Sequence, residues 1–410
     1  MKRKNYWLLL AILLLSLSSL SPGLEFSGGG SDVKNPEAEG VTVQTPPRHD
    51  TATGPIRIAA SLNTTEYNEL LRVSEHIEKQ TGIQVTIDRV EEPDLYDMYN
   101  SNYELGEAAD IVLVENGWIR PLAERGYLLP VETYNASEIS GAGMTHIMAQ
   151  MEWNGYTWAA PQDSDPYVLV GHRSRLQALG LSRLPSGLQE WKQLLSVWKK
   201  GDGAGQRAGL SLTKDMRGLL ALLEFIEGES KSVQVQQLLK DKELLSLVEG
   251  LRPYIRPDHE ESLEETDPSW SVAVMPLSEV MNEDKALLNN WWIRLPHHIQ
   301  WGITNRSWAV SASTQHAEEA GKWIAEITAS DEAVRWYERT GKLPVDAGLY
   351  RSPALADAAN IVPPEGQEKG YMEPGEFPAV SFLSSPVWSE RVKQLLQGQL
   401  PVQEWLNLMP

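Results

Sequence analysis

The sequence predicts an α/β fold, in which strands and helices alternate along the chain. Three patterns support this fold class. Residues 56–60 and 83–87 have the composition of short strands, and the residues between them carry apolar side chains at helical spacing. Residues 109–114 form a continuous apolar run, which is typical of a strand buried on both faces of a parallel sheet. The order strand, helix, strand, helix, strand therefore predicts a sheet with right-handed crossovers.

The first helix follows a polar turn. We expect Thr64 or Thr65 to cap this helix and Gly82 to end it. In open α/β sheets the ligand lies beyond the carboxyl ends of the strands. Two loops are expected at such ends, residues 62–67 and residues 115–118, so both are expected to face a ligand.

The later elements follow the same alternation. Trp191, Leu195 and Trp198 form one apolar helix stripe, which indicates core packing. Further helices are expected at 188–200, 214–227, 233–249, from 317, at 385–396 and after 401, with strands at 271–276, 292–296 and 307–311.

Composition excludes several classes of protein. The chain has 410 residues, a net charge of −20, no cysteine, and fifteen tryptophans against four phenylalanines. Without cysteine, a disulfide scaffold, a thiolate metal site and a cysteine-linked lipid are impossible. An acidic chain repels phosphate backbones, so we expect no nucleic-acid partner. Tryptophan offers a broad flat face and one N–H donor, so its excess indicates stacking on a partly polar ligand.

The N-terminus has the pattern of an export signal. Lys2, Arg3 and Lys4 precede a short apolar run and a serine-rich stretch. Residues 1–24 are therefore expected to be a signal peptide, or an uncleaved N-terminal anchor. Residues 25–54 are rich in Gly, Pro, Thr and acidic residues, which predicts a flexible linker.

Chemical motifs are mostly absent. The sequence contains no G-x-S-x-G, no Walker loop and no H-E-x-x-H, and the adjacent His297 and His298 lack a carboxylate partner motif. We therefore expect no metal and no cofactor. Asp163 and Asp165 are two residues apart and could act as an acid/base pair or as a calcium corner, although a glycosidase usually draws its carboxylates from distant segments.

Several blocks in order resemble a known family. They are residues 56–87, residues 109–118 with 123–130, residues 153–161 with 165–170, and, later in the chain, residues 307–327 with 341–345. Together they are similar to the maltose-binding-protein-like extracellular solute-binding proteins of bacterial ABC importers. Many Gram-positive members carry a lipobox cysteine after the signal, and this chain has none.

The resemblance implies a two-lobed clamshell of the periplasmic-binding-protein type (type II). Each lobe would be a mixed sheet flanked by helices, joined by a hinge of crossing strands, and the ligand would bind in the cleft. The N-lobe would comprise residues 55–163 plus 309–343. The C-lobe would comprise residues 167–306 plus 346–410.

The resemblance also implies a set of ligand contacts. Asp165 falls on the hinge position where relatives hold sugar hydroxyls with a carboxylate, or it is a solvated hinge cap. The Asp165→Ala variant is expected to weaken binding and leave the fold stable. Trp118 would stack on the ligand, and Trp301 and Trp388 would either stack on it or pack. The full expected set is Asn63, Thr64, Thr65, Tyr67, Asn116, Gly117, Trp118, Asp163, Asp165, Tyr167, Trp301 and Trp388.

The implied function is binding and not catalysis. We expect a monomeric receptor, secreted or held at the cell surface by an uncleaved N-terminal segment. It would capture a neutral sugar or oligosaccharide and deliver it to membrane permease subunits. The alternatives are a cell-surface sugar sensor for a membrane kinase and, less favoured, an exported glycosidase that uses Asp163 or Asp165.

Overall fold

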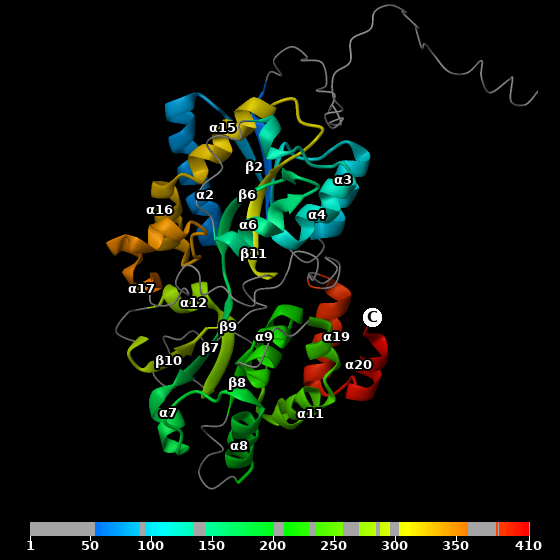
Figure 1. Cartoon of the computed structure of the whole chain (residues 1–410), viewed down its shortest axis with the longest axis vertical. Helices are drawn as coiled ribbons and strands as arrows, with labels where there is room; N and C mark the ends of the chain where they lie inside the picture. The colour runs from blue at the N-terminus through cyan, green and yellow to red at the C-terminus, as the bar shows by residue number, and fades with distance from the viewer. Residues whose placement is uncertain are drawn as a thin grey trace, which may run out of the picture. The chain divides into compact units, whose positions relative to one another are not determined.

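A computed structural model gives the arrangement of the chain (Figure 1). It describes residues 54–90, 95–134, 144–200, 209–228, 235–256, 270–283, 288–295, 303–359, 383 and 385–409. The expected signal or anchor, residues 25–53 of the expected linker, the His297–His298 pair and Trp301 lie outside these residues. In the described part of the chain, no helix is long and apolar enough to span a membrane.

The first sheet is mixed and has the strand order β2-β1-β3-β11-β6. β1, β2 and β3 are parallel, whereas β11 is antiparallel to both β3 and β6. Side chains alternate between two cores: Ile56 and Ile58 face one, and Ala59 faces the other. The strands are β1 Ile56–Ala60, β2 Val85–Arg89, β3 Ile111–Glu115, β6 Ala160–Ser164 and β11 Asn305–Val310.

Helices cover both faces of the first sheet, as Figure 1 shows. One core holds side chains from α2, α15 and α16, and the other holds side chains from α3, α4 and α6. A short hairpin packs on the second core. The helices and the hairpin are α2 Thr64–Thr81, α3 Leu95–Leu105, α4 Asn116–Glu124, η1 Val131–Thr133, α6 Thr145–Met151, β4 Glu152–Trp153, β5 Tyr156–Thr157, α15 Ala317–Ile327 and α16 Ser330–Thr340.

The second sheet is also mixed, with the order β10-β7-β9-β8. β7 is antiparallel to β9 and β10, and β8 is parallel to β9. Leu169 faces the larger core of this sheet, whereas Val168 and Val170 face the smaller one. The strands are β7 Tyr167–His172, β8 Leu210–Leu212, β9 Val272–Pro276 and β10 Trp291–Arg294.

The helices of the second sheet include the last two of the chain. α19 and α20 pack into the same core as α8, α9 and α11 (Figure 1). The elements are α7 Arg173–Ala178, α8 Gly187–Lys200, α9 Met216–Glu227, α10 Val235–Lys240, α11 Lys242–Leu251, η2 Arg252–Tyr254, α12 Leu277–Met281, η3 Ala347–Arg351, η4 Pro353–Leu355, α17 Ala356–Ala359, α19 Pro386–Gln397 and α20 Val402–Leu408.

The chain passes from the first sheet to the second at Asp165, where the resemblance implied a hinge. β6 belongs to the first sheet and β7 to the second, so residues 165 and 166 make one crossing. β10 and β11 lie in different sheets, so the chain crosses back between them. Leu343, after α16, exchanges two backbone hydrogen bonds of 2.9 Å with Ser164. The lobe boundaries proposed from the sequence stay a prediction.

Local expectations needed three corrections. Residues 64–67 and 116–118 are helical, so the loops expected at 62–67 and 115–118 are largely the first turns of α2 and α4. The cap of α2 is Asn63 and not a threonine. The helix expected at 233–249 is two helices, because Asp241 caps α11 by accepting from the backbone N–H groups of Glu243 and Leu244.

Candidate functional site

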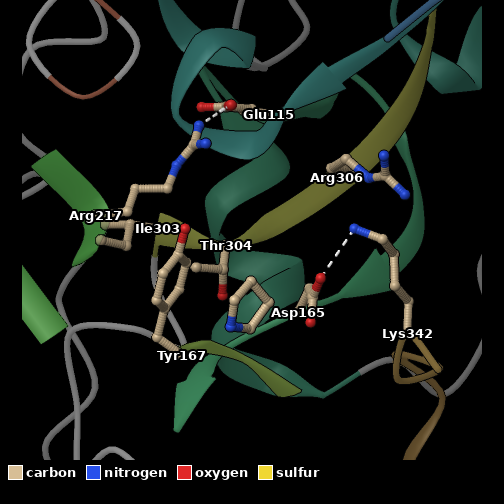
Figure 2. Close-up of a pocket in the computed structure, with 9 residues that line it drawn as sticks. Glu115, Asp165, Tyr167, Arg217, Ile303, Thr304, Arg306 and Lys342 are labelled. Carbon is tan, nitrogen blue, oxygen red and sulfur yellow. Dashed lines mark hydrogen bonds and ion pairs between the residues drawn. The ribbon is translucent and has the colours of Figure 1, made fainter. Parts of the chain in front are cut away.

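A cavity of about 190 Å³ is lined by residues of both sheets and of the connections between them. Glu115 ends β3 and Pro276 ends β9, so the cavity lies at carboxyl ends of strands, as expected for a ligand site in an α/β sheet. Figure 2 shows the lining side chains converging from several elements. They are Glu115, Asp165, Tyr167, Arg217, Pro276, Ile303, Thr304, Arg306 and Lys342.

Arg306 is held in the cavity wall by two carboxylates. Its Nε lies 2.9 Å from Asp163 Oδ1 and its Nη2 lies 2.5 Å from Asp163 Oδ2, a bidentate pair. The same Nη2 lies 3.1 Å from Glu66 Oε1. The indole N–H of Trp336 donates to Asp163 as well, at 2.9 Å. The guanidinium is therefore fixed in place, and Asp163 is fully occupied by it and by Trp336.

Glu66 joins this cluster from the first turn of α2. Its backbone N–H donates to Asn63 Oδ1 and its side chain accepts from the Asn63 N–H, both at 2.9 Å, so the two residues form a capping box. Burial by itself raises the pKa of Glu66, but Arg306 and Lys342 outweigh burial and lower this pKa to about 2. The carboxylate is therefore ionised at any physiological pH.

Lys342 connects Glu66 to the crossing. Its Nζ lies 3.1 Å from Glu66 Oε1 and 3.0 Å from Asp165 Oδ2. Asp165 also accepts from the backbone N–H of Ser278 at 2.9 Å and from its hydroxyl at 2.7 Å. Burial and Arg306 act to lower the pKa of Lys342, but the surrounding carboxylates outweigh them and raise it. Asp165 thus ties α12 of the second sheet to residues packed on the first.

Arg217 enters the cavity from the opposite wall. It is the second residue of α9, and its guanidinium forms an ion pair with Glu115 at the end of β3 (Figure 2). Every cation that lines the cavity, at 217, 306 and 342, is thus paired with a carboxylate. The cavity therefore offers many donors and acceptors, and none of these three cations lacks a carboxylate partner.

Tyr167 supplies the aromatic surface among the lining residues. Burial, with the nearby charge of Asp215, raises the pKa of its phenol well above the ordinary value, whereas a hydrogen bond with Thr213 acts in the opposite sense. The hydroxyl is therefore neutral and can both donate and accept. Of the expected contacts that the structure describes, Tyr167 and Asp165 line this cavity.

The residues expected in the first loop have other roles. Asn63 is exposed and caps α2, and Thr64 and Thr65 are exposed in its first turn. Tyr67 is half-buried, with the Arg89 guanidinium 5.8 Å from the centre of its ring. None of these four lines the cavity, although Glu66 of the same helix turn pairs with Arg306 in its wall.

The residues expected in the second loop belong to α4. Asn116 is buried and accepts a 2.6 Å hydrogen bond from the Ser307 hydroxyl, and Gly117 is half-buried. Trp118 is only 1% exposed and packs edge-on against Tyr99, with ring centres 5.9 Å apart. The expectation that Trp118 stacks on a ligand is therefore corrected, since α4 turns its indole into the core.

Two more expected contacts lie away from the cavity. Asp163 is completely buried beneath Arg306, so it supports the wall and does not line it. Trp388 is half-buried at the start of α19, edge-on to Trp405 at 5.9 Å and with the Arg391 guanidinium 4.5 Å from its ring centre. Trp388 also does not line the cavity.

Sequence reasoning missed the cations of the site. Arg306 is a single charge inside an otherwise neutral stretch, which is the signal that could have revealed it, whereas Arg217 closely follows Lys214 and Asp215 and carries no such signal. Lys342 lies inside a block already noted for its resemblance. Among the described residues, no group of three or more His, Cys, Asp or Glu side chains could hold a metal ion.

Comparisons with known proteins agree with this architecture. The sequence model of the bacterial extracellular solute-binding proteins matches residues 73–363. No curated protein matches the chain.

Solved structures share the fold at low identity. The GacH receptor of Streptomyces glaucescens, solved unliganded and with acarbose, is 16% identical with a TM-score of 0.66, over 87% of this chain and 96% of that one. Maltose-bound MalE3 of T. maritima is 16% identical with a TM-score of 0.67, over 86% and 97%. UgpB of Mycobacterium tuberculosis, solved with glycerophosphocholine, is 14% identical with a TM-score of 0.61, over 87% and 97%.

These similarities confirm the two-lobed α/β fold, with helix-flanked mixed sheets, that the sequence predicted. The matched region of the family covers well over half of the chain and includes most of the strands that form the cavity. The chain belongs to the bacterial extracellular solute-binding proteins.

Proposed function

We propose that the protein is the receptor of an ABC importer and captures a carbohydrate, a neutral sugar or oligosaccharide, for delivery to membrane permease subunits. The observation that carries this proposal is that every cation lining the cavity has a carboxylate partner. Lys342 and Arg217 each face a carboxylate, at Asp165 and Glu115. A ligand with a net charge would disturb these pairs, whereas hydroxyl groups can bond to both members of a pair.

The solutes of similar structures support this choice. Acarbose and maltose are neutral or nearly neutral polyols, and they are the ligands of two structures that share the fold. Glycerophosphocholine, the ligand of UgpB, carries both a positive and a negative charge. A cavity whose cations are all paired suits a solute without net charge, and we favour the carbohydrate because the cavity is rich in hydrogen-bonding groups.

Binding without catalysis fits the two aspartates considered as an acid/base pair. Asp163 accepts from Arg306 and Trp336 and is completely buried. Asp165 accepts from Lys342 and twice from Ser278. A general acid must reach the bond it cleaves, and both carboxylates are engaged by other side chains. We therefore propose a binding protein and not a glycosidase.

The test is a titration of the protein with maltose, acarbose, D-mannitol and glycerophosphocholine, followed by tryptophan fluorescence and thermal unfolding. A solute that binds the native state stabilises it by about 2.7 kcal/mol at a hundredfold excess over Kd. A shift with a carbohydrate supports the proposal. A shift with glycerophosphocholine alone, or with none of the four, would contradict the carbohydrate assignment.

A matched pair of variants locates the site. Tyr167→Phe removes a hydroxyl from the cavity and is expected to weaken carbohydrate binding about 3- to 10-fold, the equivalent of one hydrogen bond. Tyr134→Phe makes the same change in the core of the first sheet, away from the cavity, and should leave affinity unchanged. Equal affinities for the two variants would argue against this cavity as the binding site.

A further inference from the structure

The ion pair between Glu115 and Arg217 is part of the cavity lining. Glu115 is the last residue of β3, and Arg217 is the second residue of α9. Both side chains line the cavity, and Figure 2 shows their charged groups meeting there. They are only 15% and 18% exposed, so solvent screens their charges weakly. A charged group of a solute in the cavity would therefore interact strongly with one member of this pair.

The position beside Arg217 favours a carboxylate. A guanidinium binds a carboxylate through charge-assisted hydrogen bonds, and the first turn of a helix also favours negative charge. This turn has little freedom, because Asp215 accepts from the Gly218 N–H at 2.8 Å and a Cβ at position 218 would lie 2.1 Å from the Thr213 carbonyl oxygen. Glu115 thus supplies, from the chain itself, the carboxylate that Arg217 attracts.

The other two cations of the cavity are less open to a change of partner. Arg306 contacts Asp163 and Glu66, and Lys342 contacts Glu66 and Asp165, so the loss of one carboxylate leaves another in place. Asp165 and Lys342 also hold the crossing between the sheets. The pair of β3 and α9 can be substituted without removing any of these contacts.

We infer that Glu115 and Arg217 set the charge selectivity of the cavity, Glu115 by excluding acidic sugars and Arg217 by excluding amino sugars. Both roles rest on the proposed function and deepen it, because they name the charge of the solutes that the cavity accepts. The carboxylate of an acidic sugar could reach Arg217 only by displacing Glu115, and the ammonium group of an amino sugar could reach Glu115 only by displacing Arg217. Each exchange would separate a shielded ion pair, whereas a neutral sugar leaves the pair intact.

Two single variants carry opposite expectations. Glu115→Gln removes the carboxylate that competes for Arg217, so it is expected to gain affinity for D-glucuronate. Arg217→Gln removes the cation that competes for Glu115, so it is expected to gain affinity for D-glucosamine. Each gain should be about 10-fold or more over the parent, the equivalent of one hydrogen bond to a charged group. Isothermal titration calorimetry of the full chain at about pH 6, where the amine is protonated and the carboxylate ionised, measures both.

Two further variants separate this pair from general effects of charge. The double variant Glu115→Gln with Arg217→Gln removes both charges and should gain neither solute. Glu124→Gln changes the net charge of the protein as Glu115→Gln does, but it breaks an exposed 2.8 Å ion pair with Arg120 inside α4. It should therefore bind D-glucuronate no better than the parent. Thermal unfolding without solute checks that each variant is folded.

Three results would overturn the charge selectivity. They are single variants that gain neither solute, single variants that gain both solutes alike, and a Glu124→Gln variant that gains D-glucuronate as strongly as Glu115→Gln. If one single variant does not fold, the other still tests the pair with its own solute. Titration of the parent with neutral sugars decides the proposed function separately, because it involves neither a charged sugar nor a variant. A parent that binds maltose, with variants that gain no charged sugar, would contradict the charge selectivity alone.

Discussion

At the scale of the single residue, tryptophan serves this protein mainly as a packing residue. Trp191, Trp308 and Trp323 are completely buried, and the indole of Trp308 meets that of Trp323 edge-on with ring centres 5.2 Å apart. The N–H of Trp191 donates to the Phe225 carbonyl oxygen at 3.1 Å. An indole can thus fill a core and satisfy a buried carbonyl at once. The tryptophan excess therefore reflects packing at the described positions more than stacking on a ligand.

The Trp118→Ala variant tests whether the tryptophans serve mainly in core packing. The indole is 1% exposed and lies among Tyr96 and Tyr99, so its removal leaves a large void in the core. We expect the free energy of unfolding to fall by about 3–5 kcal/mol. Urea unfolding measures the loss. Unchanged stability together with lost carbohydrate binding would instead restore Trp118 to the ligand site.

Glu66 makes stability depend on pH. Its folded pKa of about 2 lies below the ordinary value of 4.5, so its stabilising effect is complete above pH 4.5 and is lost as pH falls toward 2. The shift corresponds to about 3 kcal/mol. Glu66→Gln should therefore lower stability at pH 6 and flatten its decline between pH 4.5 and 3.

Urea unfolding across that pH range is the measurement. The matched control is Glu124→Gln, which removes an exposed carboxylate paired with Arg120. An exposed pair contributes at most about 1 kcal/mol, so this control should follow the parent. If the stability of Glu66→Gln changed with pH as the parent's does, the pKa of Glu66 would not be lowered by Arg306 and Lys342 in the folded protein.

At the scale of the element, the first turn of α2 joins helix capping to the charged cluster. Asn63 and Glu66 cap each other, and Glu66 in turn pairs with Arg306. The helix therefore begins where its third residue can reach the cavity wall. The capping motif and the charged cluster share the Glu66 carboxylate. A substitution in the cap is therefore expected to disturb the ion pair between Glu66 and Arg306.

Asn63→Ala should reveal this shared role. Loss of an N-cap side chain costs about 1 kcal/mol, whereas Asn63→Asp keeps an acceptor for the Glu66 N–H and should cost much less. Urea unfolding compares the two variants. If Asn63→Ala kept full stability and lost only carbohydrate binding, the side chain would be a ligand contact, as the resemblance implied.

At the scale of the whole molecule, one carboxylate joins the two sheets at their crossing. Asp165 lies between β6 and β7, accepts from Ser278 of α12, and pairs with Lys342 beyond α16. Segments far apart in the chain therefore meet at one side chain. A substitution of Asp165 can therefore change both the stability of the fold and the affinity for a ligand.

Asp165→Ala is accordingly expected to destabilise the unliganded protein, contrary to the expectation from sequence. It leaves the Ser278 N–H and hydroxyl without their acceptor and removes one of the partners of Lys342, at a cost of about 2–4 kcal/mol. Asp88→Ala, which breaks an exposed pair with Arg57, is the control and should cost under about 1 kcal/mol. A stable Asp165→Ala variant with weakened binding would return Asp165 to a direct ligand role.

Periodicity made most of the fold predictable. The strand expected at 56–60 is β1, and the helices expected at 188–200 and 385–396 are α8 and α19 within one residue. These elements depend on side chains a few positions apart, which the sequence displays directly. Loop 115–118 was wrong because Glu115 ends a strand and α4 starts at the next residue without a side-chain cap, and Asn116 and Gly117, which favour turns, lie in its first turn.

The sequence by itself determined the α/β fold class, the order of its elements and the family resemblance. Only the tertiary structure decided which polar residues meet. Arg217 and Glu115 are 102 residues apart, and Arg306 and Glu66 are 240 apart. The spacing of apolar residues indicates on which face of its own helix or strand a side chain lies. Which residue pairs with a charged side chain depends instead on how distant elements pack together. The carboxylate partners of the cavity's cations could therefore be identified only once the two sheets were in place.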